Sequence, residues 1–247
     1  MRRILYSIYQ IVIAGPIFLI LTILTAVTTI TGSIFNSKIW GYYPGKIWSM
    51  LTCYLALLPV KVYGREHIRK ETSYVFVANH QGAFDIFLIY GFLGHNFKWM
   101  MKQGLRRIPF VGKACASAGH IYVDKSSPKK IQETIEEACH VLKDGMSLVV
   151  FPEGARTFTG TMNRFKKGAY FLADELQLPV VPLTIEGSFD VLPRTGKMLK
   201  RHALKLTIHE PIYPTCQGAE NIKELIAKSY EVINEDLPEE YRSHSVM

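Results

Sequence analysis

A run of 34 residues without a charged side chain, residues 4–37, is the strongest constraint on how this sequence can fold. Its most apolar part, residues 11–30, would be about 30 Å long as a helix, which matches the hydrocarbon thickness of a bilayer. A secretory signal peptide also places basic residues before an apolar segment, but this run is longer than a typical signal core and no clear cleavage site follows it. The sequence therefore predicts a membrane-anchoring segment at residues 1–62.

A second apolar stretch, residues 47–60, is only 14 residues long and is short for a membrane span. It predicts an interfacial or re-entrant helix, because basic residues and the aromatic residues typical of the headgroup boundary surround it. These residues are Lys38, Lys46, Lys61, Trp40, Tyr42, Tyr43 and Trp48. Two helices within one leaflet and a true membrane span both fit this pattern.

The charge distribution points to a membrane surface as the partner of the first residues. The chain carries a net charge of +8, yet residues 1–65 contain six Lys or Arg and no acidic residue. The remaining residues are nearly balanced in charge, so the basic excess favours anionic lipid over nucleic acid. Four scattered cysteines without a paired motif are typical of a reduced, cytoplasmic protein.

From about residue 63 the sequence alternates between strand and helix patterns. Short β-rich runs predict strands at residues 74–78, 98–101, 121–123, 148–151, 180–185 and 204–208, and helical patterns cover residues 127–145, 168–178 and 220–234. The first of these helices has Ser127 as its expected N-cap and Gly145 as its expected end. This alternation predicts an α/β domain over residues 63–247, with a mixed, largely parallel sheet flanked by helices.

One polar pair, His80 and Asp85, follows the first predicted strand. On a continuous helix, residues five positions apart would lie about 140° apart around the axis and could not meet. If His80 closes the strand and Asp85 begins a helix, the carboxylate can accept a hydrogen bond from Nδ1 and leave Nε2 as a base. Such a pair suits deprotonation of an alcohol. A turn histidine beside a helix-capping aspartate is the alternative interpretation.

A second polar turn, residues 151–156, follows another predicted strand. Pro152 ends the strand's hydrogen bonding, Gly154 allows close approach of the backbone, and Arg156 offers a planar guanidinium suited to phosphate. Three more cations follow, at Arg164, Lys166 and Lys167. A solvated loop with a surface ion pair is the alternative, although a phenylalanine–proline pair followed directly by Glu153 and an arginine is unusual for such a loop.

Basic residues also surround Lys102, and Asp124 and Lys125 follow the predicted strand at residues 121–123. Neither group is diagnostic alone, because ordinary surface charge has the same composition. The sequence contains no P-loop, G-x-G-x-x-G or H-E-x-x-H motif, and no cluster of ligands at metal-binding spacing. We therefore expect no cofactor and no metal site.

Four motifs, taken together in their order and spacing, are highly specific. They are Asn-His-x4-Asp at residues 79–85, Lys-x-x-Leu-x-x-x-Pro-x-x-Gly at residues 102–112, Phe-Pro-Glu-Gly-Ala-Arg at residues 151–156 and Val-Pro-Leu-Thr-Ile at residues 181–185. They resemble the bacterial 1-acyl-sn-glycerol-3-phosphate acyltransferase (lysophosphatidic acid acyltransferase) family of glycerolipid acyltransferases. The resemblance covers roughly residues 63–210, and the apolar segments before it are similar in kind to that family's two-helix membrane motif.

The resemblance implies a role for each matching residue. It makes His80 the general base and Asp85 the residue that orients it, and it assigns substrate binding to a second group. That group consists of Glu153, Gly154, Arg156, Lys102 and Lys125, with Glu153 and Arg156 at the acceptor phosphate. Two positions depart from the family pattern, since Lys125 replaces the usual arginine and Ala155 replaces the usual threonine; both departures concern the acceptor.

The resemblance also implies a reaction. An acyl group would pass from an acyl carrier protein or coenzyme A thioester to the sn-2 hydroxyl of 1-acyl-glycerol-3-phosphate, giving phosphatidic acid at the cytoplasmic face of a bacterial inner membrane. The partners would be the phospholipid bilayer, the lysolipid acceptor and the thioester donor, without nucleic acid. Two alternatives stay open: transfer to another lysolipid, such as an amino-acid lipid or lysophospholipid, and a non-catalytic, lipid-binding membrane protein.

Overall fold

The structure is a computed structural model that describes residues 2–124, 126–143 and 146–243. The predicted site residue Lys125 and the predicted helix end at Gly145 lie outside these residues. Within them the chain forms one sheet with the strand order β1-β7-β6-β2-β5-β3-β4. The strands are β1 (Val60–Tyr63), β2 (Val75–Ala78), β3 (Phe97–Lys102), β4 (Ile121–Val123), β5 (Ser147–Val150), β6 (Val180–Glu186) and β7 (Leu204–Ile208).

Neighbouring strands pair in parallel, except for β6 and β7, which are antiparallel. The predicted mixed, largely parallel sheet is therefore confirmed. Strand β1 was not predicted, because its first residue, Val60, ends the second apolar stretch and the next three residues add too little pattern to mark a strand. It pairs with β7 at the edge of the sheet, so the sheet already begins at Val60, ahead of the predicted domain boundary at residue 62.

Helices precede the sheet and cover both of its faces. They are α1 (Arg2–Tyr9), η1 (Gln10–Ala14), α2 (Gly15–Ser33), α3 (Ser37–Trp40), α4 (Tyr43–Leu55), η2 (Arg65–His67), α5 (Asp85–Phe92), η3 (Gln103–Arg107), α6 (Val111–Ser117), α7 (Pro128–Lys143), α8 (Gly168–Glu175), α9 (Ser188–Val191), α10 (Ala219–Asp236) and η4 (Glu239–Tyr241). The predicted cap of α7 is present, since the Ser127 hydroxyl accepts from the backbone N–H of Lys130 at 3.3 Å.

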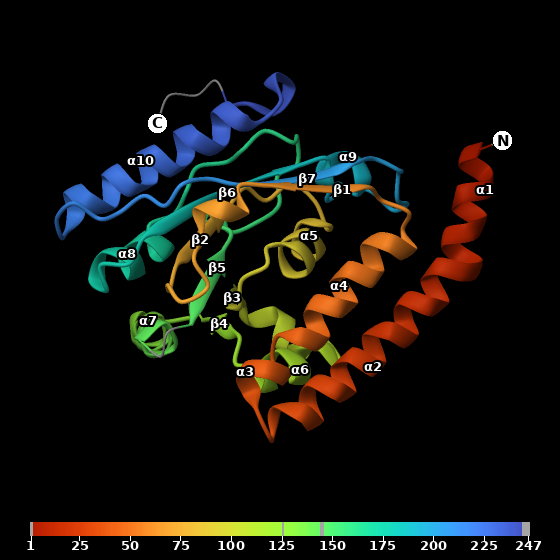
Figure 1. The fold of residues 1–247 in the computed structure, drawn as a ribbon, viewed down its shortest axis with the longest axis horizontal. Helices are drawn as coiled ribbons and strands as arrows, with labels where there is room; N and C mark the ends of the chain where they lie inside the picture. Colours follow the sequence, from red (N-terminus) through yellow and green to blue (C-terminus); the bar gives the residue numbers. More distant parts are fainter. Residues whose placement is uncertain (1, 125, 144–145, 244–247) are drawn as a thin grey trace.

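Two apolar cores lie on opposite faces of the sheet, with α4 and α5 over one face and α7, α8 and α10 over the other (Figure 1). Successive residues of a strand point to opposite faces. Accordingly, Phe76 of β2 joins the core that contains Leu88 of α5, while its neighbour Val77 joins the core that contains Leu172 of α8. Both faces of the central strands are therefore buried, which explains their continuous apolar sequence.

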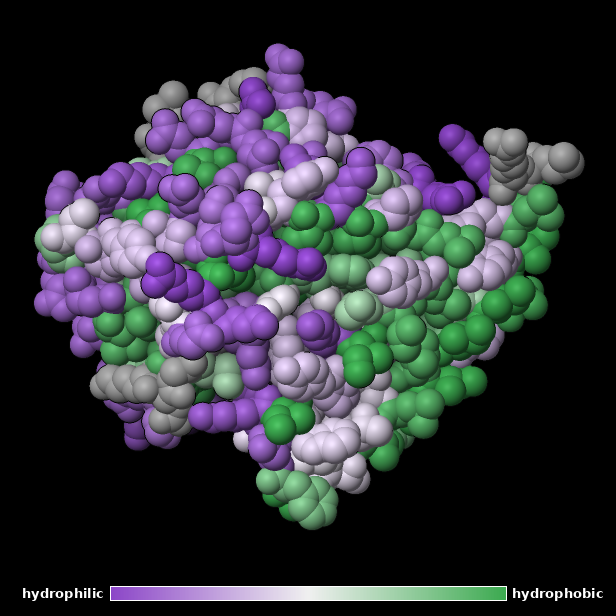
Figure 2. Space-filling view, viewed as in Figure 1, coloured by the Kyte–Doolittle hydropathy of each residue, from purple (hydrophilic) through white to green (hydrophobic). Residues whose placement is uncertain are grey.

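The N-terminal helix is continuous through α1, the π-helical turn η1 and α2. Residues 3–33 are long and apolar enough to cross a membrane by length and composition. One side packs against the protein through small residues such as Ala14, Ala26 and Gly32, and the other side exposes a stripe of large apolar residues. The stripe consists of Ile13, Ile17, Ile20, Leu24 and Val27. Figure 2 shows it within a green band over α1 and α2 at the right-hand edge.

The N-terminal helix is attached to the rest of the chain by side-chain hydrogen bonds. The Gln10 amide lies buried in η1; its Nε2 donates to the carbonyl of Leu199 at 2.9 Å and its Oε1 accepts from the same residue's N–H at 3.0 Å. The hydroxyls of Tyr6 and Tyr9 donate to the carbonyls of Ala56 and Leu55 at 2.7 and 2.8 Å. These contacts hold α1 and η1 against both the end of α4 and the loop before β7.

Candidate active site

His80 and Asp85 meet at the carboxyl end of β2. The strand ends at Ala78, the chain turns, and α5 begins at Asp85. His80 Nδ1 lies 2.8 Å from Asp85 Oδ2, with the carboxylate side chain fully buried and the imidazole 16% exposed. No described residue hydrogen-bonds to His80 Nε2. The turn therefore orients the imidazole through Nδ1 and leaves Nε2 at the surface of the site.

The same Asp85 oxygen closes the turn. Oδ2 also accepts from the backbone N–H groups of Gln81 at 2.8 Å and Gly82 at 3.0 Å. Any residue larger than glycine at position 82 would clash, because a Cβ there would lie 2.2 Å from the backbone oxygen of Ser188. A carboxylate that accepts three N–H groups is strongly held, so Asp85 fixes both the backbone of the turn and the orientation of His80.

An aromatic ring supports the imidazole from one side. The ring of Phe151, just after β5, stacks on His80 with centroids 3.9 Å apart and planes 11° apart, and the Trp99 ring of β3 stacks on Phe151 at 5.6 Å. Such stacking restricts rotation of the imidazole and keeps water from one face of it. Neither ring was among the predicted site residues. The signal in the sequence for Phe151 was its place as the first residue of the second polar turn.

Glu153 holds the backbone of the histidine turn. Its Oε1 accepts from the His80 N–H at 2.6 Å, and its Oε2 accepts from the backbone N–H and the side-chain amide of Asn163 at 2.9 and 2.8 Å. Burial raises the pKa of the Glu153 carboxyl to about 7, although the N–H groups of Asn163 and His80 oppose that rise. The carboxylate is only 5% exposed, so it faces the turn and not the surface.

Two further contacts fix the turn, and sequence reasoning assigned neither. The Asn79 side chain pairs with the backbone of Ile185 in β6, donating from Nδ2 at 2.9 Å and accepting at Oδ1 at 2.8 Å. The backbone N–H of Thr157 donates to the carbonyl of His80 at 2.9 Å. The histidine turn is thus held by β6 and by the turn after β5, which are far away in the sequence.

The turn after β5 also gathers positive charge beside His80. Gly154 has a φ of +75°, which favours glycine, and a Cβ there would lie 2.6 Å from Nζ of Lys166. Arg156 is half-buried, and its carbonyl accepts from Nη1 of Arg194 at 3.3 Å. The predicted residues Gly154 and Arg156 therefore share one turn with Glu153, and Lys166 joins them as a cation that the predicted site did not include.

These positions suit a transfer reaction on a hydroxyl group. An imidazole with one nitrogen bonded to a carboxylate and the other open can take a proton from an alcohol. Cations and a flexible glycine backbone on the next turn can bind an anionic group of the same substrate. Within the described residues, no three His, Cys, Asp or Glu side chains are grouped so as to hold a metal ion.

The comparison with known families agrees with this chemistry. A family model described as Acyltransferase matches residues 59–186, which is just over half of the chain and includes both polar turns. This chain is a member of the acyltransferase family. Its fold, its two turns and its motif order are therefore those of the acyltransferase family.

Similar proteins of other organisms confirm the resemblance of this chain to the lysophosphatidic acid acyltransferases. It is 30% identical over 174 residues to the chloroplastic 1-acyl-sn-glycerol-3-phosphate acyltransferase BAT2 of Brassica napus, covering 70% of this chain and 50% of the relative. It is 32% identical over 158 residues to the 1-acyl-sn-glycerol-3-phosphate acyltransferase of Saccharomyces cerevisiae, covering 63% and 52%. The chain thus spans about half the length of these curated relatives.

A solved structure has the same fold over nearly the whole chain. The crystal structure of the 1-acyl-sn-glycerophosphate acyltransferase PlsC from Thermotoga maritima is similar with a TM-score of 0.71 and 26% sequence identity, covering 90% of this chain and 95% of that chain. The similarity therefore extends beyond the α/β domain into the N-terminal helices.

One more predicted site residue, Lys102, lies further along the same edge of the sheet. Strands β2, β5, β3 and β4 are parallel neighbours, so their carboxyl ends meet at one edge of the sheet. Lys102 ends β3, the strand beyond β5, and its side chain is exposed. It is on the edge that carries His80, but β5 separates the two strands. Lys125 lies outside the described residues.

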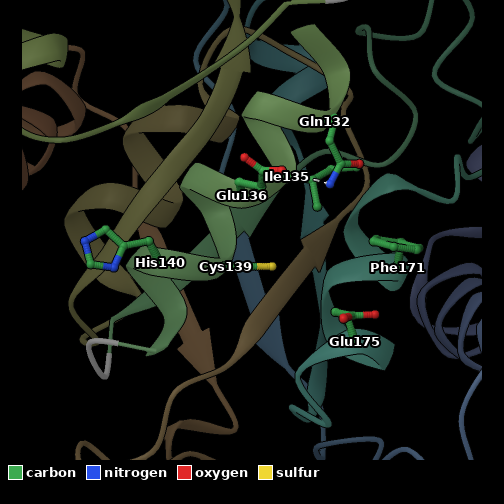
Figure 3. A pocket seen from close by; sticks show the side chains of 7 residues that line it. All are labelled: Gln132, Ile135, Glu136, Cys139, His140, Phe171 and Glu175. Carbon is green, nitrogen blue, oxygen red and sulfur yellow. Dashed lines mark hydrogen bonds between the residues drawn. The ribbon is translucent and has the colours of Figure 1, made fainter. Parts of the chain in front are cut away.

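A separate cavity of about 410 Å³ lies between α7 and α8 (Figure 3). Its lining includes Glu136, Cys139, Phe171 and Glu175, and none of these residues belongs to a strand end. Helices α7 and α8 cover the sheet face opposite to α4 and α5. This cavity is therefore distinct from the site at His80.

Proposed function

We propose that this acyltransferase moves a fatty acyl group from an acyl carrier protein or coenzyme A thioester to the sn-2 hydroxyl of 1-acyl-glycerol-3-phosphate, forming phosphatidic acid. The single observation that carries this proposal is the His80–Asp85 pair, with Nε2 open, next to a cationic turn. The names of the relatives support the acceptor.

In this reaction His80 acts as the general base. Nε2 takes the proton of the acceptor hydroxyl while its oxygen attacks the thioester carbonyl. When the tetrahedral intermediate collapses, the C–S bond breaks and the imidazolium returns the proton to the thiolate. The buried Asp85 carboxylate stabilises the imidazolium through Nδ1. No acyl-enzyme is required, because thiolate is a good leaving group. General-base catalysis contributes roughly 10²–10⁴-fold, so positioning of both substrates supplies much of the remainder.

The acceptor phosphate is proposed to bind at the turn after β5. Arg156 supplies a planar guanidinium and Lys166 a point charge, while the backbone at Gly154 allows close approach. We propose a different role for Glu153, since it is buried and its two oxygens already accept three N–H groups of the protein. In our proposal Glu153 positions His80.

Glu153→Gln is expected to lower kcat about tenfold to a hundredfold and to leave the KM for the acceptor near its original value. The amide keeps one acceptor oxygen but turns an NH₂ group toward the N–H of either His80 or Asn163, and an unsatisfied buried donor costs about 1–3 kcal/mol. Steady-state kinetics measure the effect, with Glu175→Gln on the exposed side of α8 as the matched control. A raised KM with unchanged kcat would instead show direct contact with the acceptor.

Arg156→Lys is expected to raise the KM for a phosphate-bearing acceptor about tenfold, because an ammonium cannot form the two parallel hydrogen bonds of a guanidinium. The KM for monoacylglycerol, which lacks phosphate, should change little. Arg69→Lys is the control, since Arg69 is exposed in the segment before β2, at the opposite edge of the sheet. Equal losses for both acceptors would show that Arg156 serves the fold or the donor.

We also propose where the enzyme works. The exposed apolar stripe of the N-terminal helix would lie in one leaflet of a bacterial inner membrane on the cytoplasmic side, where the thioester donors are found. The opposite side of the helix packs against the protein, and the groove between α2 and α4 is lined mainly by apolar and aromatic residues. The packing of one side of the helix against the protein supports a helix within one leaflet, and the exposed Leu19 and Ile23 widen its apolar surface beyond the stripe.

Turnover of the purified full-length protein with several lysolipid acceptors, each offered with both thioester donors, tests the proposed substrates. Highest kcat/KM with 1-acyl-glycerol-3-phosphate is the expected result. Preference for an amino-acid lipid or a lysophospholipid would assign a different acceptor to the same chemistry. Binding of lysolipid without turnover would contradict the catalytic proposal.

A further inference from the structure

One strongly basic surface is not used by the proposed mechanism. We call residues 192–203, between α9 and β7, the basic loop. No acidic residue occurs between residues 191 and 209. The loop has four cations, all of them exposed, at Arg194, Lys197, Lys200 and Arg201. A stretch with this charge attracts an anionic partner.

The beginning of the basic loop is bonded to the turns of the active site. Pro193 forms a β-bridge with Gly82, and the N–H of Ala83 donates to the carbonyl of Leu192 at 3.1 Å. Arg194 donates to the carbonyl of Arg156 and lies over the Phe158 ring, 4.2 Å from its centroid. The loop thus starts directly beside the histidine turn.

The middle of the basic loop is bonded to the N-terminal helix. Leu199 forms both of its backbone hydrogen bonds with the Gln10 amide of η1, and Nε of Arg201 donates to the carbonyl of Leu57, just after α4. Figure 1 shows this loop, in blue, beside the upper part of the N-terminal helix. The basic loop therefore connects the active-site turns with the proposed membrane anchor.

The attachment at Gln10 determines the depth of the loop relative to a membrane. Ile8 and Val12, two residues before and after Gln10, are 52% and 65% exposed and point away from the loop. A helix is about 10–12 Å across, and the headgroup layer is about 5–8 Å thick. If the apolar side of the helix is buried about 5 Å below the hydrocarbon boundary, a loop on its other side lies about 5–7 Å above that boundary, at the level of the lipid phosphates.

We infer that the basic loop binds the anionic headgroups of the leaflet that holds the N-terminal helix, through Lys197 and Lys200. This inference rests on the membrane attachment proposed above. Met198 lies between the two lysines and is 41% exposed, which gives the loop an apolar side chain as well as charge. Attachment to the lipid-facing helix favours lipid over an acidic acyl carrier protein. The loop would hold the active-site turns at a fixed distance from the lysolipid acceptor.

The distribution of the full-length protein between two vesicle populations tests this inference. One population is phosphatidylcholine alone, and the other contains about one third phosphatidylglycerol and is loaded with sucrose so that it sediments. Apolar burial is the same for both populations. The ratio of protein bound to the phosphatidylglycerol vesicles to protein bound to the phosphatidylcholine vesicles therefore reports the electrostatic part of binding. The double variant Lys197→Gln with Lys200→Gln is expected to lower the ratio about thirtyfold at low salt, since each lysine near an anionic surface contributes roughly fivefold.

The control removes the same charge from the other side of the sheet. Lys129→Gln with Lys223→Gln changes exposed residues of α7 and α10 and should keep the original ratio. High salt should reduce the ratio of the unmodified protein toward that of the loop variant, because salt screens exposed charges. A loop variant with an unchanged ratio overturns the inference.

Two other outcomes also overturn the inference, and they differ from each other. If the loop variant keeps the original ratio but has a raised KM for the carrier-protein donor, the loop binds the acidic acyl carrier protein and not lipid. Protein that binds neither population would contradict the membrane attachment as well. Turnover is measured separately, so an inactive enzyme with the expected ratio would contradict only the proposed reaction and would support the loop.

Discussion

His80→Ala is expected to lower kcat roughly 10²–10⁴-fold, because the variant loses the proposed general base. Asp85→Asn is expected to cause a severe loss too, since an amide does not stabilise the imidazolium and can favour the wrong tautomer. Both effects should appear in kcat under saturating substrates. Nε2 is the only ring nitrogen of His80 that is open to a substrate among the described contacts, so the effect should not depend on the acceptor chosen.

A matched histidine controls for this result. His140 is exposed on α7, on the face of the sheet opposite to α4 and α5, and His140→Ala should keep normal turnover. Thermal unfolding of each variant separates catalysis from folding, because Asp85 also closes the turn through Gln81 and Gly82. Near-normal turnover of a folded His80→Ala variant would disprove the proposed mechanism.

Glutamate at three positions of the apolar stripe, Ile13, Ile20 and Leu24, is expected to move the protein from the membrane pellet to the supernatant. Each side chain is at least 47% exposed in the structure, so these changes leave the packed side of the helix intact. Burial of one such side chain in an apolar phase contributes about 1.5 kcal/mol or more, and loss of three lowers the partition coefficient at least about a thousandfold. Sedimentation after a high-salt wash measures the change.

Three exposed apolar residues of the α/β domain serve as the control for this variant. Glutamate at Ile131, Phe171 and Tyr213 adds the same charge to exposed apolar positions away from the anchor, and this variant should remain in the pellet. Detergent, but not salt, should release the unmodified protein. Release of the unmodified protein by salt alone would show that charge and not apolar burial holds it at the membrane. Deletion of residues 1–60 is a poorer test, because Cys53 and Leu58 belong to the core beneath α5.

The sequence was sufficient to predict the layers of the fold and the region of the site. The continuous apolar runs of β2, β5 and β6 are typical of strands covered on both faces, and the polar residues directly after them mark the carboxyl edge. The long uncharged run identified the N-terminal helix. Strand β1 was missed because four residues beside an apolar helix carry too little pattern to be separated from it.

The detailed geometry of the site could not be predicted, because its contacts join residues far apart in the chain. His80 receives its backbone support from Glu153, which is 73 positions away, and its stacking partner is Phe151. The order in which distant strands pair and the rotamers of the side chains decide such contacts, and a local sequence pattern specifies neither. The inward orientation of Glu153 is the clearest case, since its motif alone fits a phosphate contact equally well.

The two hydrogen bonds between the Asn79 side chain and the Ile185 backbone can form only late during translation of the chain. These two residues are 106 positions apart, and translation proceeds at about 5–20 residues per second. The apolar N-terminal helix is thus made seconds before the strand that completes the histidine turn. With the proposed membrane attachment, a nascent chain can therefore reach the lipid surface through that helix while its histidine turn is still unformed.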